Sequence, residues 1–272
     1  MTAQPDRAAL LALELPPSDI DALEARAAAG ELTLVATSGG PGAGKDAWAP
    51  WILRNVFDVD EDFMTHRAYA DPLRDELNDI IAAALPSHAR GDRQAAITTL
   101  AEQFRLSPTE ATSMVTLLWE RDRLEGLNAW RRKELDPQSG QLLRRLLQLH
   151  GTDIRRRQDP DYWVKRLVPR LAEDLQQGRA VYLTDVRETN EVAGVQALGG
   201  IVVRLDATVE TRQARIADRD GYTPSPSELS HPIETALDAY DGFDVRVSND
   251  GSWQDTGAAL LEAFETHPAL AS

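Results

Sequence analysis

Short apolar runs alternate with amphipathic stretches along most of the chain. Residues 32–37, 180–184 and 201–205 are largely apolar and rich in β-branched side chains, as in strands buried on both faces of a sheet. Two shorter extended runs lie at residues 65–70 and 244–247. Because helical patterns separate about five such strands, the sequence predicts an α/β fold with a mainly parallel sheet.

Helical patterns occupy the parts of the chain that lack strand signals. Residues 1–30 predict a helical prefix, and residues 86–150 predict helices without a strand. Within this insert, Ser107–Glu110 reads Ser-Pro-Thr-Glu, a capping box with proline at the first helical position, so a helix begins there. Residues 159–178 predict another helix, with a kink at Pro169, because an internal proline costs a helix about 3 kcal/mol.

A glycine-rich turn follows the first predicted strand. The segment Gly39–Asp46, here called the phosphate turn, has the G-x-x-x-x-G-K spacing of a P-loop. Glycines let successive backbone N–H groups curl around phosphate oxygens, and the helix that begins at Lys45 points its positive end at the same anion. The alternative is a glycine-rich strand-to-helix connection with an incidental lysine. The residues expected to bind ATP are Gly39, Gly42, Ala43, Gly44, Lys45, Asp46 and Ala47.

The residue after the lysine departs from the general P-loop pattern. Serine or threonine usually stands there as a magnesium ligand, whereas this chain has Asp46. A carboxylate repels a triphosphate unless a cation or an ordered water lies between them. We therefore predict that Asp46 faces Mg²⁺, either directly or through the water shell of the ion.

The apolar run at residues 180–184 is followed by Asp185, in the manner of a Walker B motif. Open α/β sheets bind ligands at the carboxyl ends of their strands, so we expect Asp185 to hold metal and acceptor there. A capping role for this carboxylate is the alternative. Arg187 and Glu191 follow at the same edge, where an arginine offers paired donors to a phosphate and an acid accepts from a base or a sugar.

A basic cluster lies at the end of the predicted insert. Arg155 and Arg156 follow Gly151 and Thr152 and precede Trp163, which is either a platform for a base or a core residue. The arginines are candidates for binding the acceptor phosphate, and a solvated basic turn is the alternative.

Further arginines recur at helical spacing after the strand at residues 201–205. Arg212, Arg215 and Arg219 lead toward a polar, proline-rich loop at residues 219–232. They resemble lid arginines, which close over ATP, exclude water and neutralise charge during transfer, and such an arginine is worth about 10³-fold in rate. The alternative is a solvated helix face.

Charge and composition narrow the range of partners. The 272 residues carry a formal net charge of −15, so we expect a mononucleotide rather than polymeric nucleic acid, which favours basic surfaces. The absence of cysteine excludes disulfides, cysteine-ligated zinc and thiol nucleophiles. No stretch approaches the roughly 20 apolar residues of a membrane span, and the N-terminus lacks a signal-peptide layout. We therefore expect a soluble, cytoplasmic protein with no membrane partner.

These motifs occur in an order that resembles the bacteriophage deoxynucleoside monophosphate (dNMP) kinases, a branch of the P-loop nucleoside monophosphate kinases. The resemblance spans most of the chain between Gly39 and Gly251. The motifs are Gly44-Lys45-Asp46, Tyr69-Ala70-Asp71-Pro72-Leu73-Arg74, Gly151-Thr152-Asp153 with Trp163, Asp185-Val186-Arg187 with Asn190-Glu191, Gly199-Gly200, the segment Arg212–Arg219, and Val247-Ser248-Asn249-Asp250-Gly251.

The resemblance implies a P-loop kinase three-layer fold, with a kinase domain at residues 31–272, a helical acceptor-side insert at about 71–150 and an arginine-bearing lid at about 212–233. It implies ATP and Mg²⁺ as cofactors, a dNMP as substrate and, for a phage-encoded protein, the host cytoplasm. The expected catalytic residues are Lys45, Asp185, Arg187, Arg212, Arg215 and Arg219, and the expected metal ligands are Asp46 and Asp185. The expected acceptor-binding residues are Asp71, Arg74, Gly151, Thr152, Arg155, Arg156, Trp163, Asp185, Arg187 and Glu191.

Other functions stay open at this point. A P-loop kinase acting on a modified base in DNA or on a non-nucleotide phosphate has the same phosphate turn. A hydrolysing switch or motor is disfavoured, because the chain lacks the N-K-x-D motif of GTPases and has Val186, not glutamate, after Asp185. The accepted bases, the choice between ribose and deoxyribose and the oligomeric state, including a homodimer, are likewise open.

Overall fold

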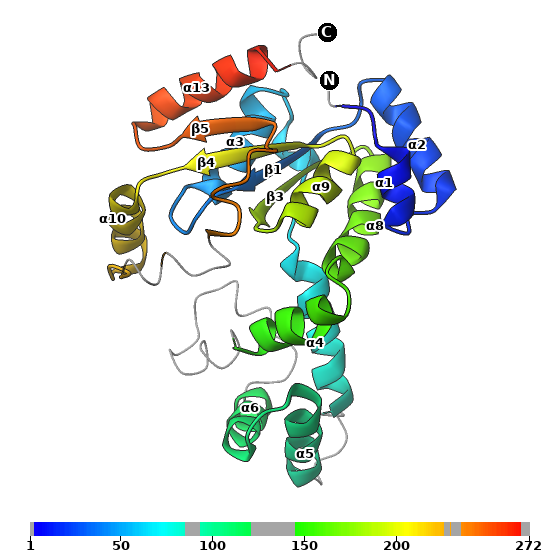
Figure 1. Ribbon diagram of the computed structural model, residues 1–272, viewed down its shortest axis with the longest axis vertical. Coiled ribbons are helices and arrows are strands. Elements are labelled where there is room, and N and C mark those ends of the chain that lie inside the picture. The colour runs from blue at the N-terminus through cyan, green and yellow to red at the C-terminus, as the bar shows by residue number, and fades with distance from the viewer. Residues whose placement is uncertain (1–2, 85–92, 121–144, 226–228, 230–234, 268–272) are drawn as a thin grey trace. The chain divides into compact units, whose positions relative to one another are not determined.

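The computed structural model describes residues 3–84, 93–120, 145–225, 229 and 235–267. The chain divides into two compact units (Figure 1). Met1–Tyr69 and Val164–Ser272 form the first, here called the sheet unit, and Ala70–Trp163 forms the second, here called the helical unit.

The sheet unit is built on a five-stranded parallel sheet in the order β2-β3-β1-β4-β5. The strands are β1 (Leu34–Ser38), β2 (Met64–Arg67), β3 (Ala180–Val186), β4 (Ile201–Asp206) and β5 (Val245–Ser248). Every residue of β1 is buried, which explains the unbroken run of apolar and β-branched residues in this central strand. The predicted α/β class with a parallel sheet is therefore confirmed.

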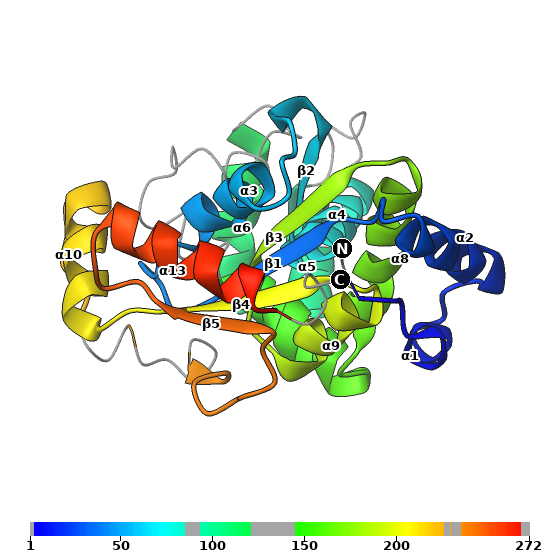
Figure 2. The same cartoon turned by 90° about the horizontal axis from the view of Figure 1, so that it is seen from above.

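Helices cover both faces of this sheet. The helices of the sheet unit are α1 (Arg7–Ala12), α2 (Pro17–Ala28), α3 (Lys45–Asn55), the short 3₁₀ helix η1 (Glu61–Phe63), α8 (Tyr162–Gln176, which begins at the end of the helical unit), α9 (Thr189–Ala197), α10 (Val209–Asp220) and α13 (Trp253–Glu265). Seen from above, α3 and α13 lie on one face and α8 and α9 on the other (Figure 2). The result is three layers.

Each face of the sheet has its own hydrophobic core. On one face, Trp48 and Ile52 of α3 and Phe264 of α13 are buried against strand residues such as Val35. On the other face, α1, α2, α8 and α9 pack together, so the predicted prefix at residues 1–30 contributes buried side chains to the sheet unit. Helices α3 and α9, which follow the neighbouring strands β1 and β3, lie on opposite faces, and open α/β sheets with this arrangement bind ligands at the carboxyl ends of such strands.

The helical unit contains α4 (Ala70–Ala84), α5 (Arg93–Phe104), α6 (Pro108–Glu120) and the π-helical segment η3 (Leu149–Arg156), with no strand among its described residues. A separate core forms there from residues that include Leu77, Phe104 and Met114. The predicted capping box is confirmed: Ser107 N donates to the Glu110 carboxylate at 2.9 Å, and Glu110 N donates to Ser107 Oγ at 3.3 Å. Residues 85–92 and 121–144 of the insert lie outside the described part of the chain.

Helix termini follow the local sequence in the sheet unit. Helix α8 contains Pro169, where the kink stays a prediction, and the chain turns at Gly178 with φ +78°. Helix α10 begins at the N-cap Thr208 and ends at Gly221 with φ +75°, where a left-handed residue closes the helix. No helix in the described ranges is both long and apolar enough to cross a membrane.

Candidate phosphate-binding site

The glycine-rich turn connects β1 directly to α3. Gly42 has φ +78° and Gly44 has φ +93°, in the left-handed region that glycine adopts without strain. A Cβ atom on Gly42 would lie 2.8 Å from the carbonyl oxygen of Arg212, and one on Gly44 would lie 2.7 Å from Asn249 Nδ2. Side chains are therefore excluded at both positions by backbone conformation and by close neighbours.

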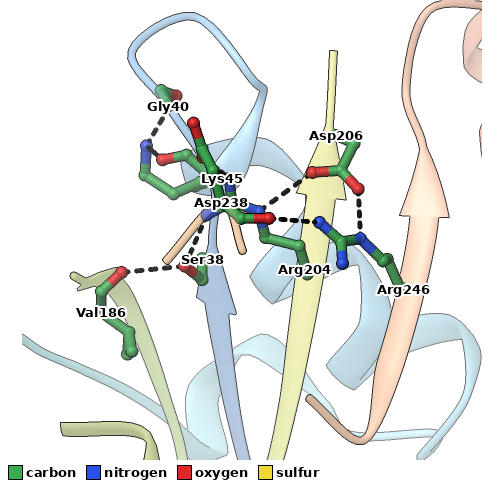
Figure 3. A network of polar contacts seen from close by, with 9 residues as sticks. Ser38, Gly40, Lys45, Val186, Arg204, Asp206, Asp238 and Arg246 are labelled. Atoms are coloured by element: carbon green, nitrogen blue, oxygen red, sulfur yellow. Dashed lines mark hydrogen bonds and ion pairs between the residues drawn. The ribbon is translucent and has the colours of Figure 1, made fainter. Parts of the chain in front are cut away.

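Lys45 folds back over this turn from the first residue of α3. Its Nζ donates to the carbonyl oxygens of Gly39 at 2.7 Å and Gly40 at 3.0 Å (Figure 3). The ammonium group is thus held beside the turn, at the N-terminus of α3, where the helix dipole favours an anion. This is the geometry that the G-x-x-x-x-G-K spacing predicts.

Asn249 braces the same turn from the loop after β5. Its side chain, in a residue 3% exposed, donates from Nδ2 to the carbonyl oxygen of Ala43 at 2.8 Å. Thr256 Oγ1 donates to Asn249 Oδ1 at 2.9 Å, so both ends of the amide are used. The sequence placed Asn249 in a motif but gave it no role.

Asp46 follows Lys45 and is exposed. Its charge reaches two neighbours. Burial raises the pKa of Tyr182 and the negative charge of Asp46 adds to this, while hydrogen bonds to Asp220 raise the pKa of Arg219 and Asp46 again adds to the shift. The negative charge of Asp46 therefore acts on one of the predicted lid arginines.

Asp46 and Asp185 are the predicted magnesium ligands. In the described part of the chain no group of three or more histidine, cysteine, aspartate or glutamate side chains forms a metal cage. Magnesium in phosphoryl transfer is usually held by one or two carboxylates together with substrate phosphates, so an exposed carboxylate beside the phosphate turn fits this ion without a cage.

Asp185, Arg187 and Glu191 lie around the carboxyl end of β3. Asp185 Oδ1 accepts a hydrogen bond from Tyr69 N at 3.0 Å, so one oxygen of Asp185 orders the backbone that follows β2. Glu191 is 1% exposed, and its carboxylate accepts from the backbone N–H groups of Arg187 at 2.7 Å and Glu188 at 3.2 Å. Glu191 thus fixes the backbone of Arg187 and also forms a capping box with Glu188 at the start of α9.

The three predicted lid arginines all lie on α10, with different surroundings. The backbone of Arg212 approaches Gly42 and its guanidinium approaches Gly40. Among the described residues, Arg212 Nε and Arg215 Nη1 are buried without a hydrogen-bond partner. Arg219 pairs with the neighbouring Asp220, with Nη2 2.6 Å from Oδ2. Arg212 is therefore the lid arginine that directly adjoins the phosphate turn.

An ionic network that the sequence did not reveal lies beside the turn (Figure 3). Arg204 of β4 donates to Asp206, Asp238 and Ser38, and Arg246 of β5 donates to Asp206 at 2.5 Å. Burial raises the pKa of Asp206, but the hydrogen bonds from Arg246 and Arg204 outweigh this effect and hold it below its usual range. A cavity of about 170 Å³ is lined by Gly40, Arg204, Leu205, Asp206, Ala207, Arg212, Asp238 and Arg246.

In the helical unit, the predicted acceptor residues at 151–156 lie in the π-helical segment η3, a rare conformation that often marks functional sites. Trp163 is 2% exposed, and its Nε1 donates to the Gly151 carbonyl oxygen at 3.0 Å. Of the two roles that the sequence left open for this tryptophan, its burial supports the core role. Arg74 pairs with Asp71 at 3.2 Å.

The carboxylate of Glu76, on α4, contacts several side chains of η3 and of the start of α8. Glu76 accepts hydrogen bonds from Arg155 Nε at 2.6 Å and Tyr162 Oη at 2.7 Å, and lies 3.0 Å from His150 Nε2. Burial raises the pKa of Glu76, but the bonds from Tyr162, Arg155 and His150 outweigh it and lower the pKa. Burial also lowers the pKa of His150. Neither Glu76 nor His150 belonged to a motif.

The predicted site residues therefore fall into two sets. The sheet unit brings together the phosphate turn, Asp46, Asp185, Arg187, Glu191 and the arginines of α10 at the carboxyl ends of its strands. The helical unit carries Asp71, Arg74, Gly151, Thr152, Arg155, Arg156 and Trp163.

The sheet unit has the three-layer architecture and the strand-to-helix glycine turn of a P-loop-like fold. Comparisons with protein families and with curated proteins find no match. Among solved structures, the chain is similar to TT1252 from Thermus thermophilus, with 17% sequence identity and a TM-score of 0.38, over 85% of this chain and 95% of that one. A likeness at this level says nothing about activity.

Proposed function

We propose that this protein is a kinase that transfers the γ-phosphoryl group of ATP to a deoxynucleoside monophosphate. The observation that carries the proposal is the turn Gly39–Lys45, whose left-handed glycines and folded-back lysine stand at the N-terminus of α3. Backbone donors, helix dipole and a mobile ammonium group converge there, and together they suit a polyphosphate.

The choice of a kinase over a hydrolase rests on two sequence features, the missing N-K-x-D motif and Val186 in place of glutamate after Asp185, and the arginines of α10 suit the transfer itself. A γ-phosphoryl group in transfer spreads negative charge over its oxygens, and arginines that approach it stabilise this charge. Arg212 adjoins Gly40 and Gly42 of the turn and has a buried Nε without a partner among the described residues, so it is suited to take up an anion there. The choice of a dNMP as acceptor rests on the order of motifs between Gly39 and Gly251.

The residues of this chain have distinct tasks in the proposed reaction. Lys45 and the turn bind the phosphate tail of ATP, while Arg187, whose backbone is fixed by Glu191, presents paired donors to the acceptor phosphate. Mg²⁺, held by Asp46 and Asp185 with the phosphates of the substrates, would supply charge neutralisation between the two anions. Transfer is in line, without a covalent intermediate, and an ionised acceptor phosphate needs no general base.

A substrate panel tests the proposal. The protein is incubated with ATP, Mg²⁺ and each dNMP, each ribonucleoside monophosphate or an oligonucleotide, and the diphosphate product is measured. We expect turnover with at least one dNMP, and its loss by a factor of about 10³ or more in Lys45→Ala. Lys165→Ala, which removes the same charge from α8, is the control and stays active.

Two outcomes contradict the proposal. If only oligonucleotides or non-nucleotide phosphates are phosphorylated, the protein is a kinase with a different acceptor. If Lys45→Ala folds normally and retains turnover, the phosphate turn is not the site of the reaction.

A further inference from the structure

Arg204 is a buried arginine that follows three apolar residues of β4. Arg204 is 5% exposed, and its guanidinium donates three side-chain hydrogen bonds (Figure 3). Nε donates to Asp206 Oδ1 at 3.0 Å, Nη1 donates to Ser38 Oγ at 3.3 Å, and Nη2 donates to Asp238 Oδ1 at 2.5 Å. A guanidinium buried at this depth needs such partners, because an unpaired charge there is strongly destabilising.

The contact with Ser38 leads directly to the phosphate turn. Ser38 is 1% exposed and is the residue before Gly39, whose carbonyl oxygen accepts from Lys45 Nζ. Its hydroxyl accepts from Arg204 and donates to the Val186 carbonyl oxygen at 3.1 Å. Val186 precedes Arg187 in turn. One hydroxyl therefore joins the carboxyl ends of β4, β1 and β3, where the predicted reactive groups begin.

The contact with Asp238 leads away from the sheet. Asp238 lies C-terminal to α10 and its arginines, and its side chain is 54% exposed. Asp206 is shared with Arg246, and Arg246 Nη2 also reaches the Asp238 carbonyl oxygen at 3.4 Å. The cavity of about 170 Å³ that Gly40 and Arg212 line extends to these same side chains. Asp238 is thus the solvent-exposed partner of the buried Arg204.

We infer that Arg204 is a positioning residue that couples the segment around Asp238 to the phosphate-binding turn through Ser38. The coupling makes the order of the turn depend on a carboxylate that is remote from it in sequence. Arg204 itself touches no reacting group in this account. Only the effect on turnover rests on the proposed kinase function; the effect on the turn itself does not.

The test removes the carboxylate of Asp238 and leaves the buried guanidinium of Arg204 in place. Amide hydrogen exchange is measured in the free protein for Asp238→Ala and for Asp241→Ala. Asp241 is exposed and, in the described part of the chain, makes no hydrogen bond to Arg204, so it controls for the loss of charge in the same region. Peptides covering Ser38–Asp46 report on the turn, and peptides covering α13 report on the rest of the sheet unit.

We expect the amides of the turn to exchange about fivefold faster in Asp238→Ala, the factor that about 1 kcal/mol makes in an equilibrium constant. Exchange in α13 stays as in the wild type, and Asp241→Ala matches the wild type throughout. Asp238→Glu, which restores a carboxylate, recovers most of the protection. Where turnover is measurable, the KM for ATP rises by a similar factor in Asp238→Ala while the KM for the acceptor does not change.

Three results would overturn the inference: equal exchange of the turn in both alanine variants, uniformly faster exchange that includes α13, or no recovery in Asp238→Glu. The outcome for the proposed function is separate. If the turn responds as expected but the wild-type protein transfers no phosphate, the coupling stands and the kinase proposal fails.

Discussion

Gly42→Ala places one methyl group at a tightly enclosed point of the phosphate turn. The residue has φ +78°, a conformation that costs an L-amino acid about 1–2 kcal/mol. The new Cβ would lie 2.8 Å from the Arg212 carbonyl oxygen and 3.1 Å from its Cα. Both are backbone atoms, which cannot rotate away as a flexible side chain would, so either the turn or the start of α10 must move.

Gly221→Ala separates the two contributions to this effect. Gly221 has φ +75°, nearly the same conformation, but a Cβ there meets nothing within 4 Å. This variant therefore carries the backbone strain without the collision, and we expect it to lower the free energy of unfolding by about 1–2 kcal/mol. Overpacking adds roughly 1–3 kcal/mol in Gly42→Ala, for a total loss of about 2–5 kcal/mol.

Urea denaturation gives the stability of both variants, and calorimetric titration with ATP gives their affinity. We expect affinity at least tenfold lower in Gly42→Ala, and wild-type affinity in Gly221→Ala. The reasoning is refuted if the two variants lose the same stability and both bind ATP as the wild type does, because the contact with Arg212 would then have no consequence.

Other predictions follow from single contacts. Asn249→Ala removes the side chain that donates a hydrogen bond to the Ala43 carbonyl oxygen, so the free energy of unfolding, measured by chemical denaturation, should fall by about 1–3 kcal/mol. ATP binding should weaken as well. An unchanged free energy of unfolding would contradict the bracing role of Asn249. The pKa values of His150 and Glu76 are both lower in the folded protein than their unfolded values of 6.5 and 4.5. Each group therefore contributes stability that is fully present above its unfolded pKa. This stability is lost as the pH falls through the folded pKa. The melting temperature of the wild type should therefore fall from about pH 6.5 downward, and the fall should be shallower in His150→Gln; parallel profiles would exclude this pair as the source.

Local signals account for what the sequence predicted correctly. The strands were found because β1 and its neighbours are largely buried and are therefore rich in apolar and β-branched residues. The turn was found because Gly42 and Gly44 must adopt positive φ, which leaves glycine at fixed spacing before Lys45. The capping box at Ser107 was found because its hydrogen bonds join residues only three apart.

Long-range pairing accounts for what the sequence missed. Arg204 and Arg246 are brought together by the register of β4 and β5, which hydrophobic periodicity does not specify. One signal was available, since a lone arginine inside the apolar run at residues 201–205 requires polar or charged partners. Their identity, Asp206 and Asp238, depends on how the chain returns after α10.

Burial adds information on roles that the sequence left open. Trp163 fitted either a base platform or a core position, and its 2% exposure with a bond to Gly151 supports the core position. Glu191 was expected to face the acceptor, whereas its buried carboxylate caps α9 and orders Arg187. In both cases the residue type indicated a possible role, but the orientation of the side chain depends on tertiary packing.

The fate of the γ-phosphoryl group tests the central claim most directly. The wild-type protein is incubated with Mg²⁺ and ATP labelled in its γ-phosphate, with and without a mixture of the dNMPs, and the labelled products are separated. The account predicts label in the β-position of a deoxynucleoside diphosphate, and little release of inorganic phosphate when acceptor is absent. Label found only as inorganic phosphate, with or without acceptor, would contradict it.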